Sequence, residues 1–230
     1  MGSSVAILSV YFVVWAVVHS WLASLRFKAW TRRQLGPGVD RWYRLAYVVF
    51  ATLTLLPLLA MVALLPDRAL YVVAPPWRWL MVLGQMAALA GLAGAVLQTG
   101  PSYFLGLSQL FGQQSVEGDL QVHGFYCRVR HPLYLFAILL MWLTPGMTVS
   151  ILTLYAWMTL YFVIGSVHEE QRLVDEFGQA YRDYQRQVPR LIPRPGQCYT
   201  PPPGRQVWKP ARRGGGSSHT QPTGQADIGS

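Results

Sequence analysis

Long apolar segments constrain the fold of this 230-residue chain more than any other feature. The first runs from Val5 to Leu25, and comparable segments occupy residues 45–65 and 77–97. A helix needs about 20 apolar residues to cross a bilayer, so each segment predicts one membrane span. Only 13% of the residues are charged, against roughly 25% in soluble domains, which is typical of a multi-pass membrane protein.

The second half of the chain contains an apolar hairpin. Its arms, residues 133–143 and 147–167, are separated by Pro145 and Gly146, which interrupt helices. The first arm is too short to cross a bilayer alone, so we expect a short or tilted helix there. The predicted fold class is an all-α, polytopic membrane helical bundle with about five transmembrane helices.

Basic residues predict the orientation of this bundle. Residues 26–44 contain six Lys and Arg side chains against one Asp, whereas residues 66–78 are nearly neutral. Positive loops favour the cytoplasm, so the amino end is expected outside and the carboxyl end inside. Cytoplasmic loops thereby explain the net charge of +9, and membrane lipids rather than nucleic acid are the expected partners.

The third apolar segment has one face of small residues. Gly84, Ala88, Gly91 and Ala95 follow one another at spacings of four, three and four, which lets a second helix approach closely. We interpret residues 1–99 as a three-span scaffold.

An amphipathic pattern follows the last span. Apolar side chains recur every three to four residues from His168 to Val188, which predicts a cytoplasmic helix that continues from the span and ends before Pro189. Beyond Pro195 the chain is rich in Pro, Gly, Ser, Thr and Gln, so residues 195–230 are predicted to be a disordered tail. Residues 100–194 are then the predicted catalytic region.

Two polar groups flank the hairpin and should lie close together, because both hairpin ends face the same side. Arg128, Arg130 and His131 precede it. His168, Glu169 and Glu170 follow it. Such groups can bind a ligand that carries both a carboxylate and a positive charge, since Arg suits bidentate contacts and aromatic rings suit cations. They can equally be lipid-headgroup contacts and ion pairs at span ends.

Two other features are less informative. His19 is the one ionisable residue of the first span, and it is either an interfacial histidine or a contact with cofactor or substrate. Cys127 and Cys198 are too few and too isolated to predict a disulfide or a zinc site, and no metal is expected.

An ordered set of motifs in the second half resembles a known family. The segments GFYCRVRHPLY, EEQRLVDEFGQAYRDY and VPRLIP, over residues 124–193, are similar to the carboxyl half of the isoprenylcysteine carboxyl methyltransferase superfamily. The resemblance implies an S-adenosylmethionine pocket at the cytoplasmic membrane face. It implies cofactor contacts from Tyr126, Arg130, His131, Pro132, Tyr134, Glu169 and Glu170, while Tyr181, Arg182 and Tyr184 would support the pocket or the substrate entrance. His19 is added to the substrate side only because it is an ionisable group inside a span.

The amino half resembles a bacterial branch of that superfamily, which contains methanethiol S-methyltransferases and NnrU-type membrane proteins. The segments VHSWLAS, FLGLSQ and WLTPGMT are the basis for this resemblance. It implies a multi-pass protein of the bacterial inner membrane. Two residues depart from the family pattern: Cys127 replaces an Arg, and Phe136 replaces a Gly.

The resulting expectation is an S-adenosylmethionine-dependent methyltransferase whose acceptor is small or dissolved in the membrane, above all a thiol. Direct displacement needs alignment more than acid–base chemistry, but a thiol must lose its proton, and His131 or Glu170 are the expected catalytic residues. The alternatives are a prenylcysteine carboxyl or lipid methyltransferase, an NADPH-dependent reductase similar to sterol reductases, and a non-enzymatic NnrU-type accessory protein. No oligomeric state is implied.

Overall fold

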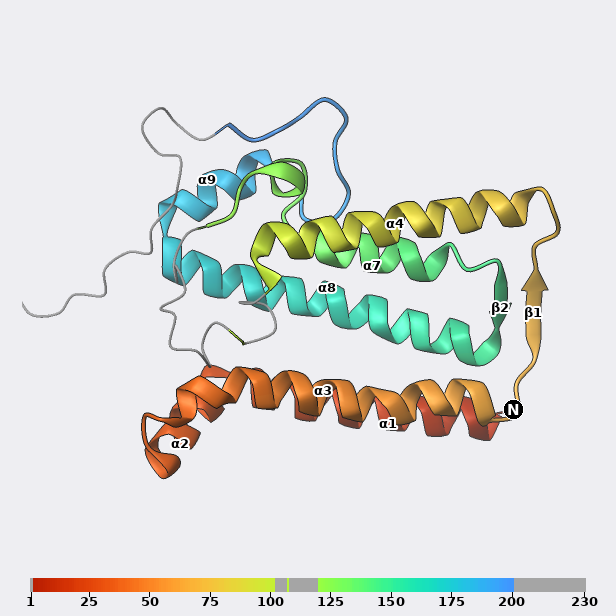
Figure 1. The fold of residues 1–230 in the computed structure, drawn as a ribbon, viewed down its shortest axis with the longest axis horizontal. Coiled ribbons are helices and arrows are strands. Elements are labelled where there is room, and N and C mark those ends of the chain that lie inside the picture. Colours follow the sequence, from red (N-terminus) through yellow and green to blue (C-terminus); the bar gives the residue numbers. More distant parts are fainter. Residues whose placement is uncertain (1, 102–106, 108–119, 201–230) are drawn as a thin grey trace, which may run out of the picture.

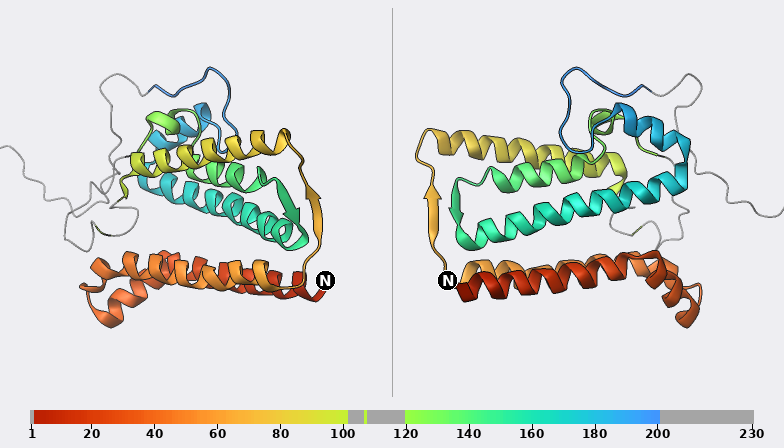
Figure 2. Two further views of the ribbon diagram at one scale, coloured as in Figure 1. Left: turned by 45° about the vertical axis from the view of Figure 1, so that its right-hand side comes forward. Right: turned by 180° about the vertical axis from the view of Figure 1, so that it is seen from behind.

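The computed structural model describes residues 2–101, 107 and 120–200. The long helices lie side by side along one axis (Figure 1), and two further views show the same arrangement (Figure 2). Four helices are long and apolar enough to cross a membrane, namely α1 (Gly2–Ala23), α3 (Val39–Leu64), α4 (Trp77–Thr99) and α8 (Val149–Phe177). The predicted polytopic helical membrane fold is therefore confirmed.

The short arm of the hairpin is α7 (Pro132–Trp142). Eleven residues make a helix of about 16 Å, roughly half the hydrocarbon thickness. Beyond α7 a turn at Leu143 leads to β2 (Gly146–Thr148), which lies at the end of the bundle reached by the neighbouring α8 (Figure 1).

A small antiparallel sheet joins the two halves of the bundle at the end where α1 begins. β1 (Ala69–Val72) pairs with β2, and the Val73 amide donates to the Pro145 carbonyl at 2.8 Å. The all-α prediction did not include this sheet. Its hydrogen bonds pair backbone groups of two segments that leave the helices at the same end of the bundle.

Three helices, α1, α3 and α8, form one packed unit. Leu8 and Phe12 of α1, Leu58 of α3 and Leu154 of α8 make a buried cluster. The Tyr11 hydroxyl donates to the Thr54 carbonyl, which also fixes α1 against α3.

The small-residue face of α4 packs against α7, as its spacing predicts. A Cβ atom at Gly91 would lie 2.5 Å from the Phe136 ring, so only Gly fits there. Phe136 also contacts Phe125, with ring centroids 5.0 Å apart. The departure at position 136 is therefore accommodated by Gly91 on α4.

The opposite end of the bundle carries most of the charged residues, and we call it the charged end. It contains α2 (Leu25–Leu35), η1 (Gly124–Cys127) and α9 (Gln179–Gln187). Ser24 caps α2 by accepting a hydrogen bond from the Phe27 amide, so the first part of the predicted loop 26–44 is helical.

The predicted single helix from His168 to Val188 is wrong in one respect. It is divided at Gly178, which has φ of 60°, so that α8 ends at Phe177 and α9 begins at Gln179. Positive φ suits glycine, and it turns the chain back over the charged end. With 29 residues α8 is about 44 Å long, so its last turns, from His168 onward, extend beyond the apolar part.

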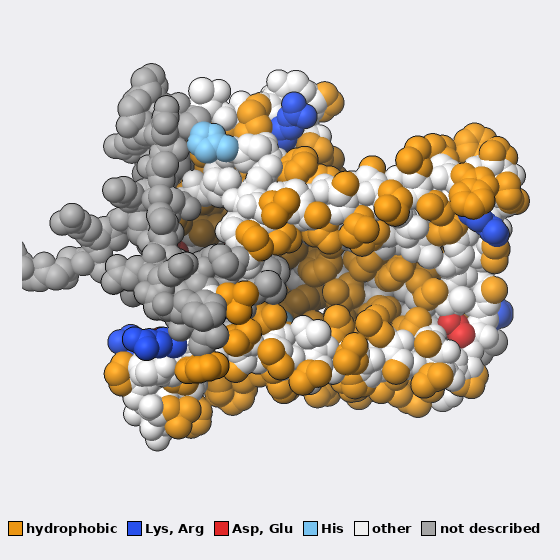
Figure 3. Space-filling view, in the orientation of Figure 1, with side chains coloured by type: hydrophobic (Ala, Val, Ile, Leu, Met, Phe, Trp, Pro, Cys, Tyr) orange, Lys and Arg blue, Asp and Glu red, His pale blue; other side chains and the backbone are white. Residues whose placement is uncertain are grey.

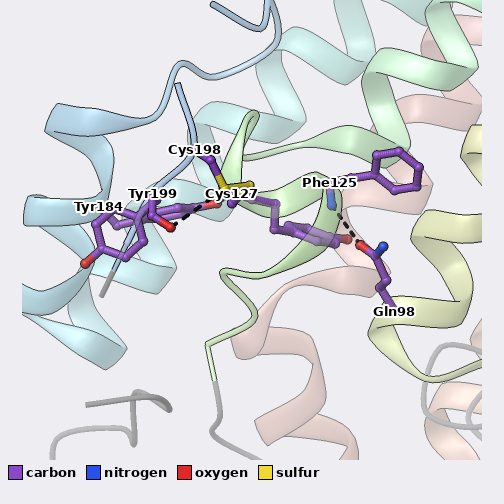
Figure 4. The surroundings of a disulfide bond; sticks show 7 residues. Gln98, Phe125, Cys127, Tyr184, Cys198 and Tyr199 are labelled. Carbon is purple, nitrogen blue, oxygen red and sulfur yellow. Dashed lines mark hydrogen bonds between the residues drawn. A yellow bond between two sulfur atoms is a disulfide. The ribbon is translucent and has the colours of Figure 1, made fainter. Parts of the chain in front are cut away.

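The expectation about the cysteines is also wrong, because Cys127 and Cys198 form a disulfide across 71 residues of sequence. Tyr199 is buried next to it, and its amide donates to the Cys127 carbonyl at 2.8 Å (Figure 4). The packed chain thus continues past Pro195, where the tail was predicted to begin. The remainder of that tail, residues 201–230, lies outside the described residues.

Candidate active site

The two polar groups that flank the hairpin meet at the charged end. Arg130 donates to both oxygens of Glu170, from Nε at 2.9 Å and from Nη2 at 3.2 Å. His131 Nε2 lies 3.1 Å from Glu170 Oε1. The hairpin ends are therefore side by side, as their positions in the sequence predict.

Residues from α9 and the segment after it complete this arrangement. Arg190 donates to Glu170 from Nε at 3.1 Å and from Nη2 at 3.0 Å, and the Gln185 side chain donates at 3.0 Å. We call the set of Arg130, His131, Glu170, Gln185 and Arg190 the Glu170 cluster. Gln185 and Arg190 were not among the predicted site residues, although Arg190 lies in the VPRLIP motif.

The backbone holds the same segments together. The amides of Arg130 and His131 donate to the carbonyls of Pro189 and Arg190 at 3.0 and 3.1 Å. Arg130 Nη1 also donates to the carbonyls of Gln185 and Val188, both at 2.7 Å. All of the nitrogens of the Arg130 guanidinium are thus used within the protein, which indicates a structural role.

Electrostatics keep the buried Glu170 ionised. Burial raises the pKa of its carboxyl, but hydrogen bonds from His131 and Arg190, together with the Arg130 charge, outweigh that effect and lower the pKa to about 2. A carboxylate with so low a pKa and so many donors is a poor proton acceptor. The geometry therefore favours Glu170 as a positioning residue.

Its neighbour Glu169 is arranged differently. The side chain is 37% exposed, accepts a hydrogen bond from the Tyr134 hydroxyl at 3.0 Å, and lies 3.6 Å from His131 Nδ1. The His131 and Tyr134 rings are stacked, with centroids 5.3 Å apart, and Tyr134 is stacked on Phe162 at 5.2 Å. Glu169 thus presents a partly exposed carboxylate beside a row of aromatic rings.

The chain is similar over most of its length to proteins named methanethiol S-methyltransferase. It is 33% identical over 190 residues to methanethiol S-methyltransferase 1 of Bradyrhizobium diazoefficiens, covering 78% of this chain and 64% of that protein. It is 31% identical over 207 residues to the methanethiol S-methyltransferase of Mycobacterium tuberculosis, covering 85% and 80%. The chain belongs to the methanethiol S-methyltransferase family. No protein-family model matches it. No solved structure matches it either.

Membership of a methyltransferase family implies a methyl donor and an acceptor. The chain spans just under two thirds of the Bradyrhizobium protein and 71% of a third relative from Crocosphaera subtropica, which is 31% identical. The names of these relatives all refer to transfer of a methyl group, and none to reduction.

The remaining residues predicted for the donor site of this methyltransferase lie around Glu169 and His131. Tyr126, in η1, interacts electrostatically with Glu169, and burial raises the pKa of its hydroxyl. Pro132 is fully buried at the first turn of α7. It begins α7 directly after the N-cap residue His131 and presents no polar side chain.

Three residues predicted for the substrate side have other positions in the methyltransferase. Tyr181 and Tyr184 are each 1% exposed and belong to the core under α9. The Tyr184 hydroxyl donates to the Tyr126 carbonyl, and so fixes η1 against α9. Arg182 is exposed on α9. These positions favour a supporting role over substrate contact for the two tyrosines.

One supporting residue was missed by the sequence analysis. Gln98, at the end of α4, accepts from the Phe125 amide at 3.1 Å, and a Cβ at Gly124 would collide with it at 2.4 Å (Figure 4). It therefore positions η1, which carries Tyr126. An isolated Gln at the end of a span gives no sequence signal for such a contact.

His19 is not part of the Glu170 cluster and contacts residues of α1, α3 and α8. Its Nε2 is 2.6 Å from the Tyr47 hydroxyl, and its ring is stacked on Trp15 with centroids 4.7 Å apart. Tyr161 of α8 lies 6.3 Å away between centroids. We call Trp15, His19, Tyr47 and Tyr161 the His19 cluster.

The surface of the methyltransferase is hollowed between α3 and α4. Figure 3 shows hydrophobic side chains along this hollow. The two helices are consecutive spans, yet α3 packs on α1 whereas α4 packs on α7. The hollow thus follows from the division of the bundle into two packed units.

Proposed function

We propose that this chain is a membrane-embedded thiol S-methyltransferase that uses S-adenosylmethionine at its charged end. The observation that supports this most is the contrast between two adjacent carboxylates: Glu170 is saturated with donors, and Glu169 is partly exposed beside aromatic rings. The names of the relatives supply the acceptor class, which we infer to be methanethiol or a similar small thiol.

The residues around Glu169 fit such a donor. A carboxylate favours a nearby positive charge and accepts hydrogen bonds from hydroxyls, and aromatic faces attract cations. Glu169, Tyr134, His131 and Tyr126 would hold the donor, and Glu170 would fix the orientation of His131. The donor supplies a methyl carbon attached to a positively charged sulfur. The protein contributes mainly by holding acceptor and donor in line.

The charged end is proposed to face the cytoplasm of a bacterial inner membrane. The basic residues of the segment 26–44, which includes α2, lie at this end, and positive segments favour that side. The donor would then bind from the compartment in which it is made.

Calorimetric titration with S-adenosylhomocysteine tests the donor site. The wild-type protein in detergent is expected to bind, and Glu169→Gln, which removes only the charge, should weaken binding at least about tenfold, roughly 1.4 kcal/mol. Asp175→Asn removes an exposed carboxylate from the same helix and should leave binding unchanged. Absence of binding by the wild type, or equal weakening by both variants, contradicts the proposal.

One observation favours a second class of acceptor. The hydrophobic hollow between α3 and α4 is suited to a lipid-soluble chain, such as a prenylcysteine or a lipid. Labelled donor offered with small thiols, prenylcysteines and lipids, followed by mass spectrometry, separates the two classes. If the protein binds the donor analogue yet methylates nothing in that panel, a non-enzymatic accessory role is favoured.

A further inference from the structure

Methyl transfer to a thiol needs a group that accepts the thiol proton. An alkane thiol is mostly protonated at neutral pH, and the thiolate is the nucleophile. At the charged end both ring nitrogens of His131 face carboxylates, and Glu170 is saturated. The Glu169 carboxylate accepts from Tyr134 and is assigned to the donor.

The His19 cluster contains a ring nitrogen that has no hydrogen-bond partner. Among the described residues, His19 Nδ1 is the buried side-chain polar atom that has no hydrogen-bond partner. Buried polar groups are nearly always paired, so an unpaired one requires an explanation. Nε2 of the same ring is already fixed by the Tyr47 hydroxyl at 2.6 Å. When Nε2 carries the proton and donates it to the Tyr47 oxygen, Nδ1 presents a free lone pair.

The surroundings of that nitrogen suit a small sulfur compound. The rings of Trp15, Tyr47 and Tyr161 surround the imidazole at centroid distances of 4.7, 4.7 and 6.3 Å. Sulfur packs favourably against aromatic rings.

The cluster lies near the proposed donor site. His19 is four residues before the end of α1 at Ala23, which is about 6 Å along the helix from the charged end. Helix α8 connects the two places, because its Tyr161 contacts His19 and the next residue, Phe162, is stacked on Tyr134. Tyr134 in turn donates to Glu169.

We propose that His19 is the general base of the reaction, an inference that rests on the proposed function. His19 Nδ1 takes the proton from the acceptor S–H group, and the Tyr47 oxygen stabilises the protonated ring. The thiolate sulfur then forms a bond to the methyl carbon, while the bond from that carbon to the donor sulfur breaks and its electron pair stays on the donor sulfur. The products are a methyl thioether, S-adenosylhomocysteine and the proton, which His19 releases to water.

A pair of acceptors of similar size but different acidity tests this role. Ethanethiol is mostly protonated at about pH 8, whereas trifluoroethanethiol is largely ionised and needs no base. His19→Gln is expected to lower kcat/KM for ethanethiol by about 100-fold or more, and for trifluoroethanethiol by less than about tenfold. The same substitution at the exposed His123 should change neither value more than about twofold.

Binding of S-adenosylhomocysteine, measured by calorimetry, provides a readout besides activity. We expect His19→Gln to bind it as the wild type does, because His19 acts on the acceptor. Equal losses of activity with both thiols, or no loss with ethanethiol, would overturn the assignment.

If His19→Gln does not fold, Tyr47→Phe is the second variant, and it should lower the ratio of ethanethiol to trifluoroethanethiol activity. An unchanged ratio in Tyr47→Phe also overturns the assignment. Failure of the wild type to methylate either thiol would instead contradict the proposed function.

Discussion

The Glu170 cluster and the half-buried His19 cluster both contain buried polar atoms, but they are completed in different ways. Glu170 accepts hydrogen bonds from four side chains contributed by three parts of the chain. His19 has one hydrogen bond and an unpaired buried nitrogen. Complete pairing is typical of a structural group, and incomplete pairing indicates a place where a ligand completes the set. Under the proposed mechanism, the Glu170 cluster shapes the site and His19 is the residue available for chemistry.

The largest expected effect is on stability, from Glu170→Gln. The substitution leaves the Arg130 and Arg190 guanidinium groups without their carboxylate, and breaking a buried pair costs about 3–5 kcal/mol. Thermal unfolding in detergent should show this loss, whereas Glu169→Gln should change the free energy of unfolding by less than about 1 kcal/mol. Equal effects of the two variants would remove the distinction between the carboxylates.

The lowered pKa of Glu170 also predicts how the stability of the protein changes at low pH. The pKa of Glu170 is lowered from 4.5 to about 2 on folding. Its contribution to the free energy of unfolding is therefore complete above pH 4.5 and is lost as the pH falls toward 2. Glu170→Gln should therefore lose stability relative to wild type at pH 7 and approach it near pH 2. A difference that does not narrow in acid would contradict the ion-pair interpretation.

Loss of the disulfide is expected to have an intermediate effect on stability. Cys127→Ser removes a cross-link between η1 and the end of the packed chain, and loss of such a bond costs about 2–4 kcal/mol. Dithiothreitol should lower the unfolding temperature of the wild type but not that of the variant. Cytosolic disulfides are usually transient, so the proposed orientation makes this bond sensitive to reductants. A melting temperature insensitive to reductant in both proteins would show that the bond contributes nothing.

The smallest effect on stability is expected from a substitution in the His19 cluster. Tyr47→Phe removes one hydrogen bond to His19, which is worth about 0.5–1.5 kcal/mol. Unfolding in detergent should therefore change only slightly, even though the ratio of the two thiol activities falls. A loss of stability as large as that of Glu170→Gln would mean that the His19 cluster is structural as well.

The sequence predicts the parts of this fold that depend on local composition. Apolar length predicted α1, α3, α4 and α8, and two polar groups at the ends of one hairpin predicted that Arg130 and Glu170 meet. Contacts that form only because the chain folds back on itself were not predictable. Arg190 reaches Glu170 only because Gly178 turns α9 back, and Cys198 reaches Cys127 by the same route.

The identity of the chemical groups was less predictable than their location. His131 and Glu170 have ordinary acid–base side chains. Only the three-dimensional contacts show that both are already engaged in ion pairs and hydrogen bonds within the protein. Tyr181 and Tyr184 fit an aromatic pocket by residue type, yet the amphipathic stripe that they belong to faces the core.

The pairing of residues 130–131 with residues 189–190 also bears on how the protein is made. A ribosome that has released the chain only as far as α8 has delivered Glu170 but not Arg190, so the nascent protein holds a buried carboxylate with part of its donors missing. Insertion of the spans and completion of the Glu170 cluster are consequently separate events in biosynthesis. A stop codon before position 190 would leave an inserted bundle whose Glu170 cluster stays incomplete.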